Sequence, residues 1–359
     1  MNYLDNTLLS KTISQLRIPM VVGVVFIHTS VSVVNVVEER AQLELIQLVM
    51  YYFSQVLPAV CVPLFFFISG FLFFYNTDFT VLAFKRKILR RTKSLFIPYV
   101  IWNFIGFIFL LVRLHITWIP IPSSLNNYSF DILTFLNCFW CIRPSEAAPP
   151  FNFPMWFIRD LMILVIFSPL LYMLIRKCKA YFIMILGGAW FFQGVLFPYS
   201  QDTSFQSLFF FPLGAYFSIN HIDFVDFSRN WKWMPVLYFL ISFIDLYSRT
   251  NEYGQLIHHF GIIIGMISFI SIISSYIEKN ERTPFYNMNE IAFFIFVSHG
   301  ILITRIGAIL EKMCKPQMPL SVLVLYFIIP IVTIMSCLLL YIILKRYMPR
   351  VLEVMVGGR

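Results

Sequence analysis

The stretch Arg17–His28 reads RIPMVVGVVFIH and opens an apolar run of the length expected for a membrane span. It begins with a cation and ends with a histidine, so ten residues separate Arg17 from His28. On an α-helix this step gives roughly 16.5 Å of rise and about 1100° of rotation, which is about 20° beyond three full turns. Both side chains are therefore expected on nearly the same helix face.

Ionisable side chains are costly inside a bilayer, where they face a bundle interior or a water-filled cavity. One interpretation of the pair is an arginine at the membrane edge and a histidine on the same line at membrane depth. The other is a basic flanking residue followed by one hydrogen-bonded core histidine. The stretch by itself leaves both interpretations open.

The composition of the chain indicates a polytopic membrane protein. Of its 359 residues, 59% are hydrophobic and only 13% are charged, whereas a typical soluble domain is about 25% charged. The apolar runs are continuous and long enough to span, which favours helices over the short alternating strands of a β-barrel. We expect an all-α fold with one transmembrane domain over residues 1–359.

Ten spans are predicted from the apolar runs, and a helix over residues 37–55 is expected on the outer face before the second span. Most of the 27 lysines and arginines share one side when the N-terminus is placed inside, so the positive-inside rule predicts that both termini are cytoplasmic. The predicted spans cover residues 18–36, 56–75, 95–114, 154–175, 181–198, 206–220, 233–248, 255–277, 290–310 and 320–344.

The densest inner segment is FKRKILRRTKSLFIPY, residues 84–99. An ordinary positive-inside anchor explains part of this cluster, but such density also suits an anionic lipid or a phosphate-bearing ligand. The net charge of +9 does not indicate nucleic acid, because the basic residues lie beside apolar spans. The candidate ligand-binding cations are Lys85, Arg86, Lys87, Arg90 and Arg91.

Three further ionisable residues lie within spans. Arg159 and Asp160 follow Pro154 near the outer boundary of the fourth span, where an interhelical salt bridge is favoured over a catalytic role. Adjacent helix residues point about 100° apart, so these two need not pair with each other. His299 lies at membrane depth in the ninth span, and a hydrogen-bonded structural role is favoured for it.

The largest outer segment, residues 115–153, carries prolines, aromatic residues and the sequence CFWC. For Cys138 and Cys141, amphipathic packing is favoured over a disulfide, and the absence of a second such pair argues against a zinc site. We expect no metal. The aromatic residues that suit the membrane interface or stacking against a sugar are Trp118, Tyr128, Phe139 and Trp140.

Five stretches in the same order resemble the acyltransferase-3 family of integral membrane acyltransferases, and together they run through residues 13–345. At 85–87 the chain has KRK in place of the family's spaced arginine pair, which leaves open which of these cations contacts a ligand. Pro19 replaces a small residue of the family, but proline early in a helix is tolerated. The stretches are ISQLRIPMVVGVVFIHTS (13–30), VPLFFFISGFLFF (62–74), FKRKILRRTKSLFIPYVIW (84–102), PMWFIRDLMIL (154–164) and AFFIFVSHGILI (292–303).

The resemblance implies a bacterial inner-membrane enzyme that takes an acyl group from cytoplasmic acyl-CoA and passes it to a hydroxyl of a cell-surface or lipid-linked glycan. Acetyl is the acyl group favoured by frequency in the family. The cationic segment faces the compartment of coenzyme A, and arginine binds phosphate through bidentate donors. We expect Arg17 to position the donor, with Arg159, Asp160 and His299 in supporting roles.

His28 is the expected catalytic residue, because a histidine with a pKa near neutral suits general-base catalysis. Two routes stay open: His28 acts as a base in direct transfer, or it carries the acyl group transiently. An alternative function is a multi-pass exporter of a sugar or lipid-linked glycan without bond chemistry. A third is a non-catalytic partner in polysaccharide assembly, which would tolerate loss of both Arg17 and His28.

Overall fold

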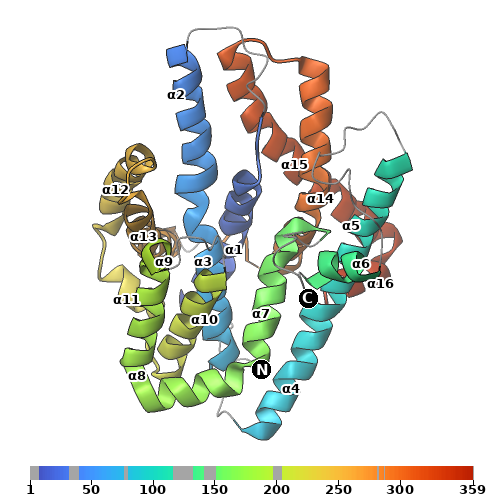
Figure 1. Ribbon diagram of the computed structural model, residues 1–359. Coiled ribbons are helices and arrows are strands. Elements are labelled where there is room, and N and C mark those ends of the chain that lie inside the picture. Colours follow the sequence, from blue (N-terminus) through green and yellow to red (C-terminus); the bar gives the residue numbers. More distant parts are fainter. Residues whose placement is uncertain are drawn as a thin grey trace.

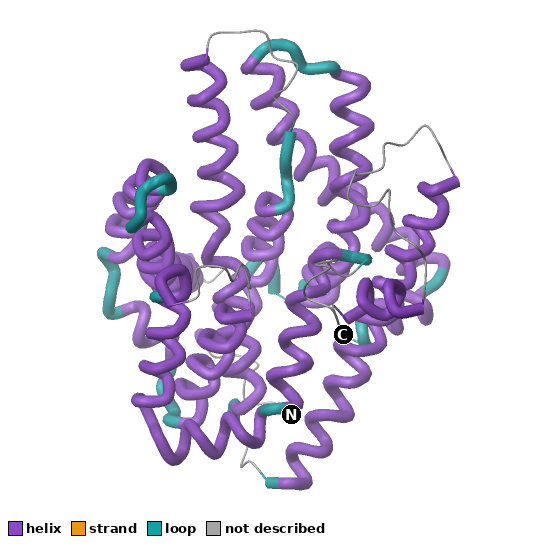
Figure 2. The backbone as a smooth tube through the Cα atoms, viewed as in Figure 1, coloured by secondary structure: helices purple, strands orange, loops and turns teal. Residues whose placement is uncertain are grey.

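The computed structural model describes residues 8–31, 40–76, 80–115, 132–140, 151–196, 204–280, 283–286 and 288–358. Within these residues every regular element is a helix, as Figure 2 shows, which confirms the all-α prediction. The α-helices are α1 (Leu8–Ile27), α2 (Arg40–Tyr51), α3 (Cys61–Phe74), α4 (Val81–Arg91), α5 (Ile97–His115), α6 (Ile132–Trp140), α7 (Trp156–Ile166), α8 (Ser168–Phe191), α9 (Gln193–Leu196), α10 (Ser204–Ile219), α11 (Phe224–Arg229), α12 (Met234–Ser248), α13 (Gly254–Asn280), α14 (Asn289–Cys314), α15 (Pro319–Tyr347) and α16 (Pro349–Met355). Four short segments of other helix types join them: η1 (Tyr52–Val56), η2 (Leu57–Val60), η3 (Thr92–Phe96) and η6 (Phe153–Met155).

Several of these helices are long and apolar enough to cross a membrane, so the chain is a multi-pass membrane protein. Among the described residues there are six such runs, or seven if the bent pair Phe153–Ile166 and Ser168–Phe191 forms one span. Two shorter apolar helices, Phe205–Ile219 and Met234–Ser248, match the predicted sixth and seventh spans. The number of ten spans and the cytoplasmic side of the termini stay predictions. The six runs are Leu8–Ile27, Gln42–Phe74, Val81–Phe109, Gly254–Asn280, Asn289–Cys314 and Pro319–Tyr347.

Helix α1 lies in the centre of the bundle, where it packs against α3, α13, α14 and α15 (Figure 1). It begins well before the predicted boundary at residue 18, because polar residues of its first half are buried instead of lying at an interface. Thr12 and Gln15 are both buried, and the Gln15 side-chain oxygen accepts a hydrogen bond from the Phe285 backbone N–H at 3.3 Å. Arg17 thus lies near the middle of α1, and its expected place at the membrane edge stays a prediction.

The other end of α1 determines the position of His28. The helix stops at Ile27, before the predicted end of the span at residue 36. The His28 backbone N–H donates to the Val25 carbonyl at 3.2 Å, so the chain leaves the α-helix in a tight turn. The Thr29 hydroxyl donates to the same carbonyl at 3.0 Å, which stabilises the turn. The position of His28 is thus determined by where α1 ends, and not by the face of an α-helix that its spacing from Arg17 predicts.

The helix predicted over residues 37–55 is present as α2 and η1, and it continues without a loop into α3. The whole run, Gln42–Phe74, is 33 residues long. Its ladder of hydrogen bonds changes type in η1 and η2, where Pro58 lacks the N–H that an α-helix would use. Segments of this kind inside helices are frequent at functional sites.

Two glycines allow α3 and α10 to cross at close range. A Cβ on Gly70 would lie 2.0 Å from the Phe211 carbonyl oxygen, and one on Gly214 would lie 2.0 Å from the Phe67 carbonyl oxygen. Only residues without a side chain fit at these positions, so the two glycines allow the close approach of the helices. The crossing is surrounded by buried phenylalanines, which account for part of the exceptional phenylalanine content.

The predicted fourth and fifth spans are divided differently in the structure. The chain bends by 64° between α7 and α8, at Phe167, because Pro169 disfavours a helical conformation at Ser168 and lacks a backbone N–H. Within α8, Lys179 has a φ of 50°, so two helices meet there with almost no loop. The predicted helix over residues 154–175 is therefore interrupted inside its range.

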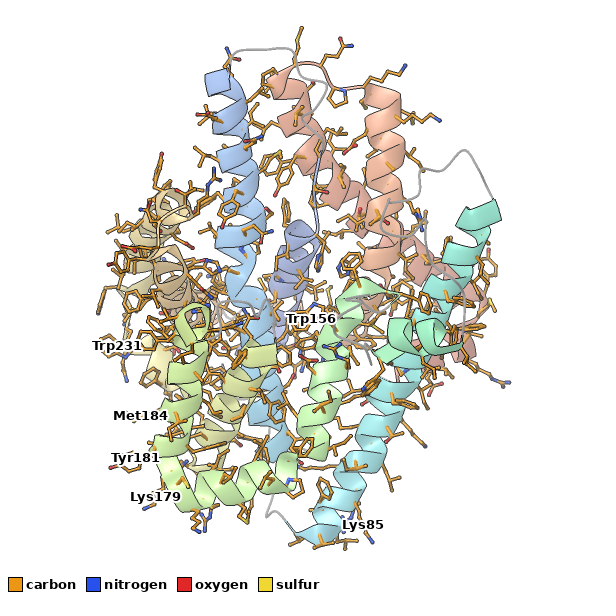
Figure 3. All side chains as sticks on the ribbon, viewed as in Figure 1. Lys85, Trp156, Lys179, Tyr181, Met184 and Trp231 are labelled. Carbon is orange, nitrogen blue, oxygen red and sulfur yellow. The ribbon has the colours of Figure 1, made fainter. Side chains whose placement is uncertain are left out.

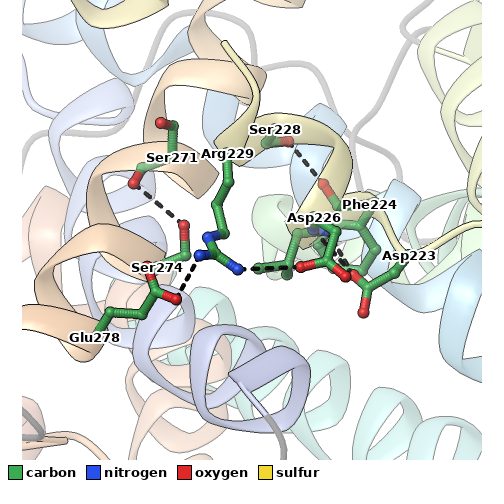
Figure 4. Close-up of polar contacts among 9 residues, drawn as sticks. Asp223, Phe224, Asp226, Ser228, Arg229, Ser271, Ser274 and Glu278 are labelled. Atoms are coloured by element: carbon green, nitrogen blue, oxygen red, sulfur yellow. Dashed lines mark hydrogen bonds and ion pairs between the residues drawn. The ribbon is translucent and has the colours of Figure 1, made fainter. Parts of the chain in front are cut away.

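Two basic segments assigned to the inner side by the positive-inside rule lie at the same end of the molecule. Figure 3 shows Lys85 at the end of α4 and Lys179 at the bend of α8, both at the lower end of the view. A third basic residue, Arg229, holds α11 on α13 through Asp226 at 3.2 Å and Glu278 at 2.5 Å (Figure 4). We refer to the end that carries Lys85 as the basic end.

Candidate active site

Two histidines from distant parts of the chain meet inside the bundle. The His28 ring, at the end of α1, stacks on the His299 ring of α14 with a centroid distance of 5.6 Å and an angle of 23° between the planes. Phe153 contacts the His28 ring from another direction, with its centroid at 4.7 Å and its plane at 76°. His28 is half-buried and His299 is fully buried. These contacts fix the orientation of the His28 ring.

His299 is held by its own helix. Its Nδ1 lies 3.1 Å from the Ile295 carbonyl oxygen, one turn earlier in α14. A carbonyl only accepts hydrogen bonds, so we assign the proton of the neutral ring to Nδ1. The Nε2 atom is buried and has no hydrogen-bond partner among the described residues. The geometry agrees with the predicted hydrogen-bonded role of His299 and adds its contact with His28.

Arg17 lines a narrow cavity of about 160 Å³, which we call the arginine cavity. Arg91 lines the same cavity, so a residue of the basic segment 85–93 lies beside the cation of α1. Phe296 belongs to the wall as well, and its ring centroid is 6.0 Å from that of His299. The arginine cavity therefore reaches within one side chain of the histidine pair.

A larger cavity of about 750 Å³ opens at the basic end, and we call it the basic cavity. Arg91 and Leu72 line both this cavity and the arginine cavity, so the two are neighbours. The Lys87 ammonium donates to the Phe73 carbonyl and lies 4.8 Å from the centroid of the Phe73 ring. The cations of the basic cavity are Lys87, Arg90, Arg91, Lys93 and Arg350.

The structure separates the five predicted ligand-binding cations into two groups. Lys87, Arg90 and Arg91 line the basic cavity, whereas Lys85 and Arg86 are exposed and line none of the three cavities described in this section. The helix periodicity explains the division, because residues three and four apart share a face of α4. Of the KRK triplet, only Lys87 faces the cavity.

On the far side of the histidine pair lies a third cavity of about 520 Å³, which we call the histidine cavity. Its wall comes from the end of α1, from α2 and η1, from the end of α12 and from α15. The Arg249 guanidinium lies 5.0 Å from the centroid of the Tyr51 ring. The polar residues of this cavity are His28, Thr29, Ser30, Gln47, Tyr51, Ser54, Gln55, Arg249 and Tyr326.

The arginine and histidine cavities lie at different heights along the same helices. Residues 17, 20 and 21 of α1 line the arginine cavity, and residues 27–31 line the histidine cavity. Along the run Gln42–Phe74 the order is reversed, because this run is antiparallel to α1: its first half lines the histidine cavity and its second half the arginine cavity. The histidine pair therefore lies between the two cavities.

Arg159 and Asp160 are not part of these walls. The spacing left a pair between these two residues open, and the structure has one: the Arg159 Nη2 lies 2.9 Å from the Asp160 carboxylate, and Nε lies 3.0 Å from the same oxygen. The guanidinium bends back along α7, because a long arginine side chain spans the angular separation of adjacent positions. The contact joins neighbours in one helix, where the sequence favoured a bridge between helices.

The aromatic and cysteine residues of the large outer segment are only partly described. Tyr99, beside the basic segment, donates from its hydroxyl to the Phe139 carbonyl and packs edge-on against Trp140 with centroids 5.8 Å apart. Phe139 and Trp140, the two described aromatic residues of the predicted set, thus pack against the protein. Trp118, Tyr128 and Cys141 lie outside the described residues, as does the Cys138 side chain.

Several residues of the site carry no local sequence signal. Tyr51 and Arg249 meet only because α2 and α12 pack on the same side of the bundle. Behind them, the His258 Nδ1 contacts the buried Asp245 carboxylate at 2.8 Å, which ties α13 to α12. The sequence position of Arg350 does not distinguish it from other cations that follow the last span of a membrane protein. No spacing in the sequence relates these residues to His28.

Comparison with known proteins adds a second line of observation. A family model described as an acyltransferase domain, of the acyltransferase-3 type, matches residues 11–344. The chain is also similar to the succinoglycan biosynthesis protein ExoH of Rhizobium meliloti (strain 1021), with 22% identity over 365 residues. The alignment covers 98% of this chain and 92% of that protein. No solved structure matches the chain.

Proposed function

We propose that this chain, which belongs to the acyltransferase-3 family and is a membrane acyltransferase, moves an acyl group across the bundle from acyl-CoA to a surface glycan. The donor enters at the basic end, which is the cytoplasmic side by the positive-inside rule. The acceptor is a hydroxyl of a cell-surface or lipid-linked polysaccharide in the histidine cavity. Similarity to a succinoglycan biosynthesis protein supports a polysaccharide acceptor. The membrane is the bacterial inner membrane, and the acyl group is acetyl.

The observation that carries this proposal is the position of the histidine pair between two cavities of different character. Phe296 of the arginine cavity is next to His299, His299 stacks on His28, and His28 lines the histidine cavity. A reaction that joins substrates from opposite sides of a membrane requires a reactive group with this access. His28 lines the histidine cavity and is separated from the wall of the arginine cavity by the His299 ring, which supports His28 as that group.

The donor side fits the shape of coenzyme A. Its nucleotide end carries several phosphate charges, and the basic cavity offers five cations and one carboxylate, Glu353. Its pantetheine arm is long and thin, and the arginine cavity is narrow. In the proposed pose the phosphates lie among the cations of the basic cavity, and the arm passes Arg17 towards His28. Arg17 then binds polar groups of the arm or of the nearest phosphate.

The acceptor side fits a carbohydrate. Hydroxyl and amide groups of the histidine cavity donate and accept hydrogen bonds, as sugar hydroxyls require. Tyr51 adds an aromatic ring, whose position is fixed by Arg249. An acceptor hydroxyl beside His28 would lie at the inner end of this cavity, next to the proposed end of the pantetheine arm.

Two reaction routes follow from this placement. In the first, a ring nitrogen of His28 takes the proton of the acceptor hydroxyl while its oxygen attacks the thioester carbonyl. The carbon–sulfur bond then breaks, and the proton passes from His28 to the coenzyme A thiolate. In the second, a ring nitrogen of His28 attacks the thioester carbonyl, the carbon–sulfur bond breaks, and the proton of the ring passes to the departing coenzyme A thiolate. The acceptor oxygen then attacks the acyl carbonyl, the carbon–nitrogen bond breaks, and the hydroxyl proton returns to the ring. Family membership argues against the exporter without bond chemistry.

The test uses a strain that lacks this chain and is complemented with the wild type or with His28→Ala. Mass spectrometry of its surface glycans reads the acyl group and the acceptor together. We expect the acyl mass to disappear on deletion, to return with the wild type, and to fall by about 10²–10⁴-fold with His28→Ala. The control is His221→Asn, an exposed histidine in the turn after α10. Wild-type acylation by His28→Ala at equal protein levels would overturn the proposal.

A second experiment separates the two routes. Membranes are incubated with labelled acetyl-CoA without an acceptor, quenched, and digested. Label on the peptide that contains His28, absent from His28→Ala, identifies an acyl carrier. A parallel incubation contains the acceptor glycan: if its carbohydrate becomes labelled while no protein label appears in either incubation, the transfer is direct with His28 as a base.

A further inference from the structure

The C-terminal helix α16 is packed onto the protein beside the basic cavity. Leu352 and Val356 are buried against the bundle, and the Trp102 indole of α5 donates to the Met355 carbonyl at 3.1 Å. Figure 1 shows α16 beside α5 and α6, at the level where the chain passes from α4 into α5. The segment is therefore a fixed part of the fold and not a free tail.

The residues after α16 close this packing. The backbone N–H of Gly358 donates to the Glu353 carbonyl at 2.8 Å, and that of Gly357 donates to the Val354 carbonyl at 3.1 Å, as in a helix end of the Schellman type. Gly357 has a φ of 73°, and a Cβ there would lie 2.6 Å from the Ser94 Cα. The chain end thus lies directly against η3.

One wall of the basic cavity comes from α4 and η3, and another comes from this C-terminal segment. Arg350, Glu353 and Gly357 are among the residues that form the second wall. Within the described part of the chain, none of the five cations of the cavity forms an ion pair with Glu353 or with another carboxylate. Among the described residues, the positive charge of the cavity is therefore not neutralised by an ion pair.

We propose that the C-terminal segment 349–358 is part of the donor site and that Arg350 binds the phosphates of the acyl-CoA. This inference rests on the proposed function, because it needs an anionic donor at the basic end. Arginine pairs with phosphate through two parallel N–H···O bonds, which are stronger than neutral hydrogen bonds. Arg350 adds such a contact from a wall far in sequence from segment 85–93, so the phosphates are bound between two elements.

The first test compares Arg350→Ala with Arg346→Ala in the full chain, using labelled acetyl-CoA at a saturating level of acceptor. Arg346 is also exposed and lies four residues earlier, at the end of α15, but its guanidinium lies 5.6 Å from the centroid of the Tyr347 ring and does not line the cavity. We expect Arg350→Ala to raise the donor KM about tenfold with kcat within about twofold. Arg350→Lys should recover part of this loss, and Arg346→Ala should match the wild type.

The second test displaces the segment without removing a charge. Gly357→Ala and Gly358→Ala share the cost of a positive φ, but only Gly357 has the Ser94 backbone next to its Cβ position, while Gly358 has nothing within 4 Å. We expect Gly357→Ala to raise the donor KM more than Gly358→Ala does. The same order is expected for the dissociation constant of coenzyme A measured calorimetrically on the purified protein.

The outcomes distinguish this inference from the proposed function. If Arg91→Ala raises the donor KM while Arg350→Ala and Gly357→Ala do not, the C-terminal segment is not part of the donor site and the proposed donor side survives. If none of the three variants changes the donor KM while label still reaches the glycan, the basic cavity is not the donor site. Both the inference and the proposed donor entry are then overturned.

Discussion

The basic cavity and the histidine cavity differ in what they offer a ligand. The basic cavity has five cations, drawn from α4, η3 and α16, and little hydrogen-bonding variety. The histidine cavity has one cation and a set of hydroxyl and amide groups from four other parts of the chain. The first suits a compact polyanion, and the second suits a neutral, hydroxyl-rich molecule. The difference indicates which substrate belongs on which side.

The arginine cavity lies between the basic cavity and the histidine pair, and Arg17 lines it. Among the variants that test the comparison of the basic and histidine cavities, substitution of Arg17 has the largest expected effect. Arg17→Ala should raise the donor KM about tenfold to a hundredfold and leave the acceptor KM unchanged, because a charge-assisted contact contributes about 1.5–3 kcal/mol. Arg17→Lys should restore part of the affinity, since lysine keeps the charge without the bidentate geometry. Steady-state kinetics with each substrate varied in turn measures both constants. A rise in the acceptor KM alone would reverse the assignment of the cavities.

Substitutions in the wall of the histidine cavity are expected to have a smaller effect, and to raise the acceptor KM instead of the donor KM. Arg249→Ala and Tyr51→Leu should each raise the acceptor KM by about threefold to tenfold, because the guanidinium that holds the ring, or the ring itself, is lost. The donor KM should stay within about twofold. The double variant tests their coupling: because the guanidinium lies over the ring, its effect should be less than the product of the single effects. Independent effects would show that the two residues do not act as one contact.

The smallest effect is expected within the basic segment itself. Lys85→Ala and Arg86→Ala should leave the donor KM within about twofold of the wild type, since both side chains are exposed and line none of the three cavities. Arg90→Ala serves as the contrast from the same helix, because Arg90 lines the basic cavity. The same purified proteins and the same donor titration give all three values. Equal effects of the three substitutions would indicate a diffuse field of positive charge in place of a defined site.

The sequence was most informative where the signal is local. Long apolar runs predicted helices, and the order of the five family stretches predicted the acyltransferase family, which the match over residues 11–344 confirms. These features depend on composition and spacing along one segment, so one segment is enough to reveal them.

The sequence was less informative where packing controls the length of a helix or the path of a side chain. Thr12 and Gln15 are buried, so α1 begins well before the apolar run and Arg17 lies near the middle of the helix. The spacing of Arg159 and Asp160 did not require the two to pair, yet the flexible guanidinium reaches its neighbour. A helical wheel gives the direction of a Cβ, and a long side chain need not follow it.

The sequence by itself determined the class of the protein, its family and the segment that concentrates positive charge, because each is written in consecutive residues. Only the tertiary structure decided which charges share a cavity, that His28 stacks on His299, and that Arg350 lies beside η3. These relations join residues that are hundreds of positions apart in the chain. They depend on how the helices cross, and helix crossings are set by packing between side chains that no single stretch contains.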